Sequence, residues 1–184
     1  MTLATSTVRA LGALSAALLT LGMLSACTPA PEPDPKPTKS GLFASDEEAF
    51  KAAEETYRAY TDALNEVDTS DPETFEPVFE YTSGDFEVND RKNLSIMHAE
   101  GFVMSGRTIV EDFRGTSTTG DRNTVHGSVC VNVSDADIRD SDGASIVPDD
   151  RPDRYVADVT FVATRGVLSI SHAETDEEKT CDAL

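Results

Sequence analysis

The stretch VHGSVCVNV, residues 125–133, decides the fold class because apolar and polar side chains alternate along it. A period of two places the two sets on opposite faces of a β-strand. Residues 155–163, YVADVTFVA, alternate in the same way, and turn sequences separate these segments at Thr119-Gly120-Asp121, Asp142-Gly143 and Arg165-Gly166. We therefore expect one antiparallel sheet in the C-terminal half, with a last strand near residues 167–173.

The segment before these strands has the period of an amphipathic helix. Ser45 followed by Glu48 is typical of a capping box at a helix start. Apolar residues then recur every three or four positions, namely Phe50, Ala53, Tyr57, Tyr60, Leu64 and Val67. The pattern predicts a helix from Ser45 to near Asp68, with one face on a core.

Two further helices are expected before the strands begin. A short one starts at Asp71, and a longer one runs over residues 85–100, with Asp85 as its cap and Gly101 as its stop. The inward residues of the longer helix would be Leu94, Met97 and His98. Helices followed by strands predict an α+β fold with the helices packed on one face of a curved antiparallel sheet.

The N-terminus has the pattern of an export signal. Residues 10–24 form an uncharged run of about 15 residues, shorter than the ~20 that a membrane-spanning helix needs. The junction Leu24-Ser25-Ala26-Cys27 resembles the bacterial lipobox. The resemblance implies cleavage before Cys27, diacylation of its thiol and anchoring on the extracytoplasmic face of the cell membrane. The alternative is an ordinary secretory signal with an incidental thiol at Cys27.

A proline-rich segment follows the cysteine. Residues 28–41, TPAPEPDPKPTKSG, have proline at nearly every second position, which favours an extended and water-exposed chain. We therefore divide the chain into a signal peptide, residues 1–26, a lipidated cysteine with its tether, residues 27–44, and one domain, residues 45–184.

The charge balance restricts the partners. The chain has 15 Lys and Arg against 34 Asp and Glu, a formal net charge of −19. Such a surface repels phosphate backbones, so no nucleic-acid partner is expected. Simple solubility, or a basic partner, accounts for the acidity.

The remaining cysteines fit an exported protein. With Cys27 assigned to lipid, Cys130 and Cys181 form an even pair, and a disulfide between them is expected. Two buried free thiols are the alternative.

The order of these segments resembles a known superfamily. Three helices, then HAEGFVMSG at 98–106, RTIVEDFRGTS at 107–117, a strand with a central cysteine and two closing strands are similar to the nuclear transport factor 2-like domains, also called SnoaL-like or cystatin-like cone folds. More narrowly, they resemble small actinobacterial lipoproteins carrying such a domain. The resemblance implies a conical pocket between the helices and a concave sheet, and homodimerisation through the open sheet face as an option.

Two functions are compatible with such a cone. In the first, it is a binding module for a small apolar molecule or a protein, with its site at the mouth near Tyr57, Tyr60, His98 and Phe102. In the second, it is an isomerase or dehydratase whose base is His98 or Asp158. Each residue also has a structural interpretation: the tyrosines and His98 as core or boundary residues, and Asp158 as a solvent-facing strand position.

Cofactor and metal motifs are lacking in the sequence. The histidines at 98, 126 and 172 have no ligand spacing, and neither Cys130 nor Cys181 belongs to a CxxC motif. DADIRDSDG at 135–143 matches a calcium loop only in part, since Ile138 stands where the first ligand is required. It is better interpreted as a hairpin. No P-loop, dinucleotide fingerprint or nucleophile elbow occurs, so neither a cofactor nor a metal is expected.

Overall fold

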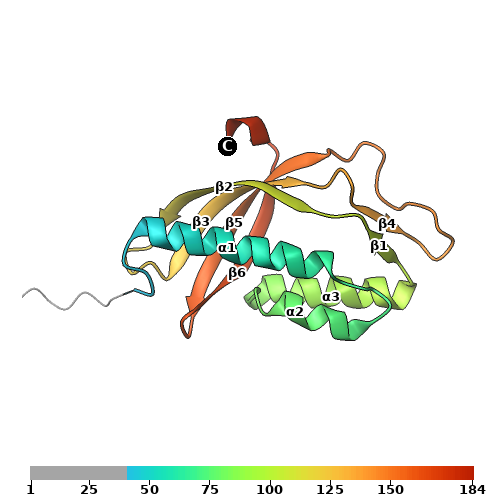
Figure 1. The fold of residues 1–184 in the computed structure, drawn as a ribbon, viewed down its shortest axis with the longest axis horizontal. Coiled ribbons are helices and arrows are strands. Elements are labelled where there is room, and N and C mark those ends of the chain that lie inside the picture. Colours follow the sequence, from blue (N-terminus) through green and yellow to red (C-terminus); the bar gives the residue numbers. More distant parts are fainter. Residues whose placement is uncertain (1–40) are drawn as a thin grey trace, which may run out of the picture. The chain divides into compact units, whose positions relative to one another are not determined.

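A four-stranded antiparallel sheet with helices on one face makes up residues 41–184, the part that the computed structural model describes (Figure 1). The predictions of a signal peptide, of lipidation at Cys27 and of most of the tether lie outside the described residues. Within residues 41–184, no helix combines the length and apolar character that crossing a membrane requires.

Helix α1, Asp46–Asn65, starts as the capping box predicts. The Ser45 hydroxyl accepts a hydrogen bond from the Glu48 amide at 3.2 Å, and the Glu48 carboxylate accepts one from the Ala44 amide at 2.8 Å. The helix ends three residues before the expected Asp68. Its buried residues are Ala49, Ala53, Tyr57, Tyr60 and Thr61.

The remaining helices follow the expected order: a short 3-10 helix η1, Pro72–Phe75, then α2, Glu76–Phe79, and α3, Gly84–Glu100. The Asp71 side chain caps η1 by accepting from the Glu73 amide. Ser83, rather than the expected Asp85, is the residue that precedes α3. Gly101 ends α3 in the left-handed region with φ of 68°, as the sequence predicts.

The large sheet has the strand order β2-β3-β5-β6, with all neighbours antiparallel. Its strands are β2, Ile109–Thr118, β3, Thr124–Asn132, β5, Arg154–Thr164, and β6, Val167–Asp176. A short ribbon pairs β1, Val103–Ser105, with β4, Asp137–Arg139. Register shifts in the pairing of β2 with β3 and of β5 with β6 interrupt the regular ladders, and shifts of this kind bend and twist a sheet locally. The predicted α+β fold is confirmed.

Two glycines that face each other across β2 and β3 leave room for aromatic rings on the inner face of the sheet. A Cβ at Gly115 of β2 would lie 2.1 Å from the Cγ of Phe50, and a Cβ at Gly127 of β3 would lie 2.6 Å from the Cζ of Phe113. Any larger residue would push these rings out of the core. Gly115 therefore lets Phe50 of α1 approach β2 closely, and Gly127 makes room for Phe113 of the neighbouring strand.

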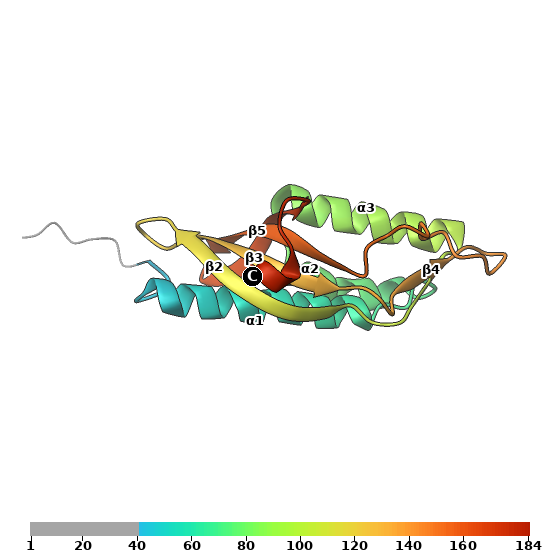
Figure 2. The same cartoon turned by 90° about the horizontal axis from the view of Figure 1, so that it is seen from above.

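The C-terminal segment covers part of the outer sheet face, opposite the helices (Figures 1 and 2). The predicted disulfide is confirmed: Cys130 of β3 is bonded to Cys181, with 5.2 Å between their Cα atoms, and the 3-10 helix η2, Cys181–Ala183, follows. Ser128, Cys130 and Val156 point to this face but are buried. On this face the strand pattern predicts a solvent-facing position for Asp158, and Lys179 of the C-terminal segment pairs with it.

Candidate functional site

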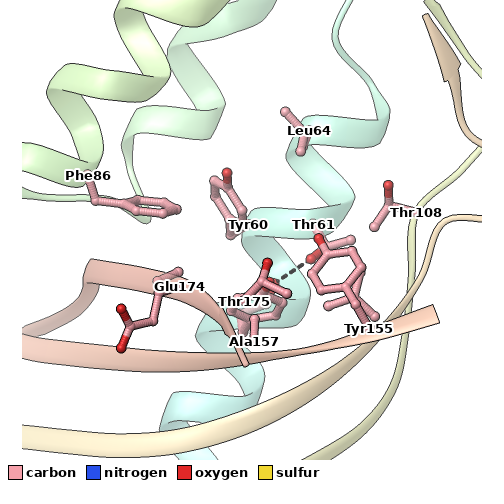
Figure 3. Close-up of a pocket in the computed structure, with 12 residues that line it drawn as sticks. Tyr60, Thr61, Leu64, Phe86, Thr108, Tyr155, Ala157, Glu174 and Thr175 are labelled. Carbon is pink, nitrogen blue, oxygen red and sulfur yellow. Dashed lines mark hydrogen bonds between the residues drawn. The ribbon is translucent and has the colours of Figure 1, made fainter. Parts of the chain in front are cut away.

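A cavity of about 230 Å³ lies between α1, the start of α3 and the paired ends of β5 and β6 (Figure 3). Its lining combines aromatic rings, small side chains and hydroxyl groups. The lining residues are Tyr57, Tyr60, Thr61, Leu64, Phe86, Thr108, Val131, Tyr155, Ala157, Ala173, Glu174 and Thr175. A concave space that combines apolar walls with several polar groups is compatible with a small-molecule site.

The aromatic side of the cavity comes from three different elements. Tyr57 and Tyr60 lie three residues apart on α1 and therefore share one helix face, with ring centroids 6.0 Å apart. Phe86 of α3 approaches Tyr60 edge-on at 5.8 Å. Tyr155 reaches the same space from β5 (Figure 3).

The tyrosine hydroxyls of the cavity stay protonated. Burial raises the pKa of Tyr57 and raises the pKa of Tyr60 well above its ordinary value, because the phenolate would lose its hydration. Burial also raises the pKa of Tyr155. Tyr57 and Tyr155 can therefore donate hydrogen bonds to a ligand, whereas the Tyr60 hydroxyl interacts with Asp90, and none of the three acts as a base near neutral pH.

Asp90 is an inward-facing acid beside the cavity. It lies one helical turn after Phe86 on α3, and its Oδ2 atom is buried without a hydrogen-bond partner among the described residues. Burial raises the pKa of Asp90 to about 6, and interaction with the Tyr60 hydroxyl opposes part of that rise. Asp90 is thus a carboxyl group that titrates close to neutral pH.

His98 and Phe102 do not line the cavity that Tyr57 and Tyr60 share. The His98 ring lies on the far end of α3, where its Nδ1 is 2.8 Å from the carbonyl oxygen of Thr69 and its ring packs edge-on against Phe75. The Phe102 carbonyl accepts a hydrogen bond from the Thr69 hydroxyl. Through these contacts with Thr69, both residues connect the loop after α1 to the end of α3.

Asp158 lies on the outer face of the sheet and not in the cone. Its two carboxylate oxygens are each 2.7 Å from the Lys179 Nζ, and one of them accepts a hydrogen bond from Ser128. Lys179 also pairs with Asp176 at 3.0 Å. Lys179 of the C-terminal segment therefore neutralises the carboxylate of Asp158, which the sequence made a candidate base.

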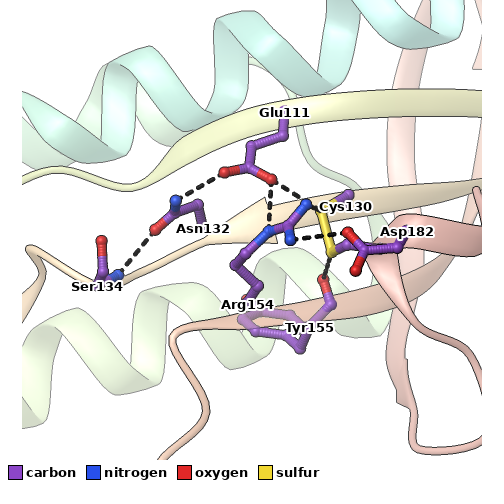
Figure 4. Close-up of polar contacts among 8 residues, drawn as sticks. Glu111, Cys130, Asn132, Ser134, Arg154, Tyr155 and Asp182 are labelled. Atoms are coloured by element: carbon purple, nitrogen blue, oxygen red, sulfur yellow. Dashed lines mark hydrogen bonds and ion pairs between the residues drawn. A yellow bond between two sulfur atoms is a disulfide. The ribbon is translucent and has the colours of Figure 1, made fainter.

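A second polar cluster surrounds the disulfide on the same outer face (Figure 4). Arg154 of β5 joins Glu111 of β2 at 2.6 Å and Asp182 of η2 at 3.0 Å. Glu111 also lies close to both cysteine sulfurs, but these sulfurs are bonded to one another and are not thiolate ligands. The cluster holds the C-terminal segment in place.

One cavity residue, Tyr155, and one residue beside the cavity, Asp90, escape sequence reasoning. Tyr155 belongs to an alternating strand, and nothing in that pattern tells which strand end reaches the cavity. Asp90 occupies the position between Phe86 and Leu94 on the inward face of α3. A carboxylate at an apolar position of a helical stripe is the signal that could have found it.

Comparison with known proteins supports the fold alone. No family model and no curated protein matches the sequence. Among solved structures, the chain is similar to the intermembrane space region of the chloroplast protein ARC6, with 12% identity, 68% of this chain and 95% of that chain covered, and a TM-score of 0.50. It is also similar to a protein from Novosphingobium aromaticivorans described as a candidate aromatic ring hydroxylase, with 14% identity, 71% and 89% covered, and a TM-score of 0.51.

The structural neighbours include a protein described as Ntf2 like and involved in plasmid conjugation. It shares 17% identity over 74% of this chain and 51% of that chain, with a TM-score of 0.37.

Proposed function

We propose that this protein is an extracytoplasmic lipoprotein, anchored to the membrane through Cys27, whose cone-shaped domain binds a small molecule. The observation that carries the binding role is the cavity itself, which has aromatic walls, neutral hydroxyl donors and about 230 Å³ of space. The combination allows both apolar contact and orientation of a ligand by hydrogen bonds. The likeness to cone folds is compatible with this role but does not select it.

The proposed location depends on the N-terminal sequence. The lipobox-like junction before Cys27 and the proline-rich segment after it would hold the domain away from the membrane surface. The Cys130–Cys181 disulfide supports an oxidising compartment outside the cytoplasm. The C-terminal segment, which ends with η2, covers part of the outer sheet face. A homodimer through that face would therefore have to include this segment in its interface or displace it.

Native mass spectrometry tests the binding role on the protein extracted from its own membranes. We expect the mass of the chain from Cys27 with a lipid increment and a noncovalently bound small molecule. The variant Ala173→Leu narrows the cavity and should lose the small molecule. His172→Leu, the neighbouring and exposed position on the other face of β6, is the matched control and should keep it.

Either of two results would contradict the proposal. A small molecule that remains bound to Ala173→Leu would not occupy this cavity. A lipid increment with no further ligand would instead favour a protein partner.

A second candidate function is catalysis of the isomerase or dehydratase kind. Asp90, rather than His98 or Asp158, favours it, because its pKa of about 6 suits proton transfer near neutral pH and it lies beside the cavity-lining Tyr60. The test is deuterium uptake from heavy water into the ligand recovered by native mass spectrometry. Catalysis requires uptake that Asp90→Asn abolishes and that Asp158→Asn and His98→Gln leave intact.

A further inference from the structure

A second cavity, of about 190 Å³, lies between the C-terminal end of α1 and the short ribbon of β1 and β4 (Figure 1). Most of its wall is apolar, and the apolar lining residues are Leu64, Val67, Met104, Val133, Ala136 and Ile138. It shares Leu64 and Thr108 with the tyrosine-lined cavity but none of the tyrosines. The two spaces are therefore neighbours with different chemistry.

Arg151 is the only basic residue among the described residues that line this second cavity. It is half-buried, and its Nη2 donates hydrogen bonds to the carbonyl oxygens of Val133 at 2.7 Å and Ala136 at 2.8 Å. Its Nη1 and Nε donate to no residue in the range 41–184, and neither atom is among the buried polar atoms that lack a partner. Both atoms are therefore accessible to solvent and to a ligand.

The charge of Arg151 is unmatched. No carboxylate pairs with it in the part of the chain that the structure describes, and the acidic residues within the segment 149–153 are exposed to water. Asp137 also lines the cavity, but it pairs with Arg139 at 2.7 Å and accepts a hydrogen bond from the Ser145 hydroxyl at 2.6 Å. The second cavity therefore presents one uncompensated positive charge beside an apolar wall.

An anion is the ligand that such a guanidinium favours. A partly buried charge is unfavourable unless an opposite charge and hydrogen bonds compensate it. The carbonyls of Val133 and Ala136 hold the guanidinium in position but do not neutralise it. Because Arg151 is already held, an anion that accepts from Nη1 or Nε binds it at a small cost in side-chain entropy.

We propose that the second cavity binds a small apolar carboxylic acid, with its carboxylate on Arg151 and its hydrocarbon part against Leu64, Met104 and Ile138. The inference goes beyond the proposed function, because it assigns a ligand class to a different cavity. The space of about 190 Å³ is several times the ~30 Å³ of a water molecule, so it holds a short-chain acid.

Other ligand classes fit this cavity less well. A cation would meet the charge of Arg151. A dianionic phosphate would be only half compensated by one guanidinium, and the formal net charge of −19 opposes it further. A neutral ligand would fill the apolar space but would leave the charge of Arg151 unmatched.

A matched pair of probes tests the charge requirement. Hexanoate and hexanamide have nearly the same shape and differ in the negative charge. Calorimetric titration of the full-length protein, extracted in a non-ionic detergent at neutral pH, measures both affinities, and detergent without protein gives the blank. We expect hexanoate to bind about tenfold or more tightly than hexanamide, as a hydrogen bond between two charged groups implies.

Two arginine variants locate the charge. Arg151→Gln removes the charge but keeps an amide donor for one of the two carbonyls, and it should abolish the preference for hexanoate. Arg154→Gln is the matched control, because Arg154 lies outside the second cavity and pairs with Glu111. It should keep the wild-type preference. Circular dichroism establishes that each variant is folded.

Two alanine variants locate the cavity and leave Arg151 unchanged. Ala136→Leu fills part of the second cavity and should lower hexanoate affinity by about tenfold or more. Ala173→Leu narrows the tyrosine-lined cavity instead and should leave hexanoate affinity unchanged. If Arg151→Gln does not fold, these variants and the two probes decide the question.

Several outcomes would overturn the inference. Equal affinity for the two probes, preference for hexanamide, or lack of hexanoate binding at millimolar concentration would reject a carboxylate site. A preference that persists in folded Arg151→Gln would exclude Arg151 as its origin. Loss of hexanoate binding in Ala173→Leu but not in Ala136→Leu would place the acid in the tyrosine-lined cavity. The native mass spectrometry of the proposed function is decided separately, because it concerns the ligand of that other cavity.

Discussion

Asp90 of α3 lies beside Tyr60 of α1 with one carboxylate oxygen buried and unpartnered among the described residues. Burial disfavours the ionised form of this carboxyl group, so the folded protein holds a proton on Asp90 more tightly than the unfolded chain does. The pair joins the two helices that flank the cavity. The effect of Asp90 on the free energy of unfolding can therefore be measured without any ligand.

The pH dependence of stability should carry the signature of Asp90. Its pKa is about 6 in the folded protein against an ordinary 3.8, so between these values the folded state binds more protons and the free energy of unfolding from this group falls as the pH rises. Because Asp90 is only partly buried, we expect about 1 kcal/mol rather than the full amount that two pKa units imply. Asp90→Asn should be more stable than the wild type by that amount at pH 8 and equal to it at pH 4.

Urea unfolding at a series of pH values provides the measurement. Asp62→Asn on the exposed side of α1 is the control and should follow the wild-type profile. If Asp90→Asn and the wild type differ by the same free energy at pH 4 and pH 8, the carboxyl group does not titrate in this range.

Gly115 should tolerate no side chain. The Cβ of Gly115→Ala would come within 2.1 Å of the Phe50 Cγ, which is not the mobile end of that side chain. We expect a loss of about 1–3 kcal/mol in the free energy of unfolding, since α1 must move away from β2. Gly120→Ala, which meets nothing within 4 Å, should stay within about 0.5 kcal/mol of the wild type. Equal effects of the two substitutions would show that α1 does not rest on β2 as described.

The disulfide should stabilise both the fold and the position of the C-terminal segment. It closes a loop of 51 residues, and we expect the double variant Cys130→Ala, Cys181→Ala to lose about 2–4 kcal/mol. Reductant should destabilise the wild type and leave the double variant unchanged.

Release of the segment can be followed by limited trypsin digestion. Cleavage after Lys179 should accelerate in the double variant because Lys179 is otherwise paired with Asp158 and Asp176. Cleavage after Arg165, in the exposed turn between β5 and β6, is the internal control. If both sites accelerate equally, the whole domain opens and the segment is not held by the disulfide in particular.

Cys27 should decide where the protein resides. Cys27→Ser removes the thiol that the lipobox resemblance assigns to lipid, so the protein should leave the membrane fraction and its mass should lack a lipid increment. Thr38→Ser in the tether is the matched control. If Cys27→Ser stays in the membrane fraction, the protein associates with the membrane without a lipid on this residue. That result would reject lipidation at Cys27.

Local patterns predicted most of the helices and strands of the domain, but not the short β1–β4 ribbon or Ser83 as the residue before α3. The capping box of Ser45 and Glu48, the αL stop at Gly101 and the period of two in residues 125–133 and 155–163 depend on neighbours a few residues away in sequence. The disulfide followed from an even count of cysteines in an exported chain. Each of these features reflects chemistry that is set before the chain folds.

The site required tertiary structure because its residues come from α1, α3, β5 and β6. Strand alternation could not show that Tyr155 reaches the cavity, that Asp158 is neutralised by Lys179, or that Val156 is covered by the C-terminal segment. These outcomes depend on the bend of the sheet and on which segment covers each face. By itself the sequence determined most of the elements, their order and the cysteine pair, whereas only the packing of distant elements decided that Tyr57, Tyr60 and Tyr155, and not His98 or Phe102, line the cavity.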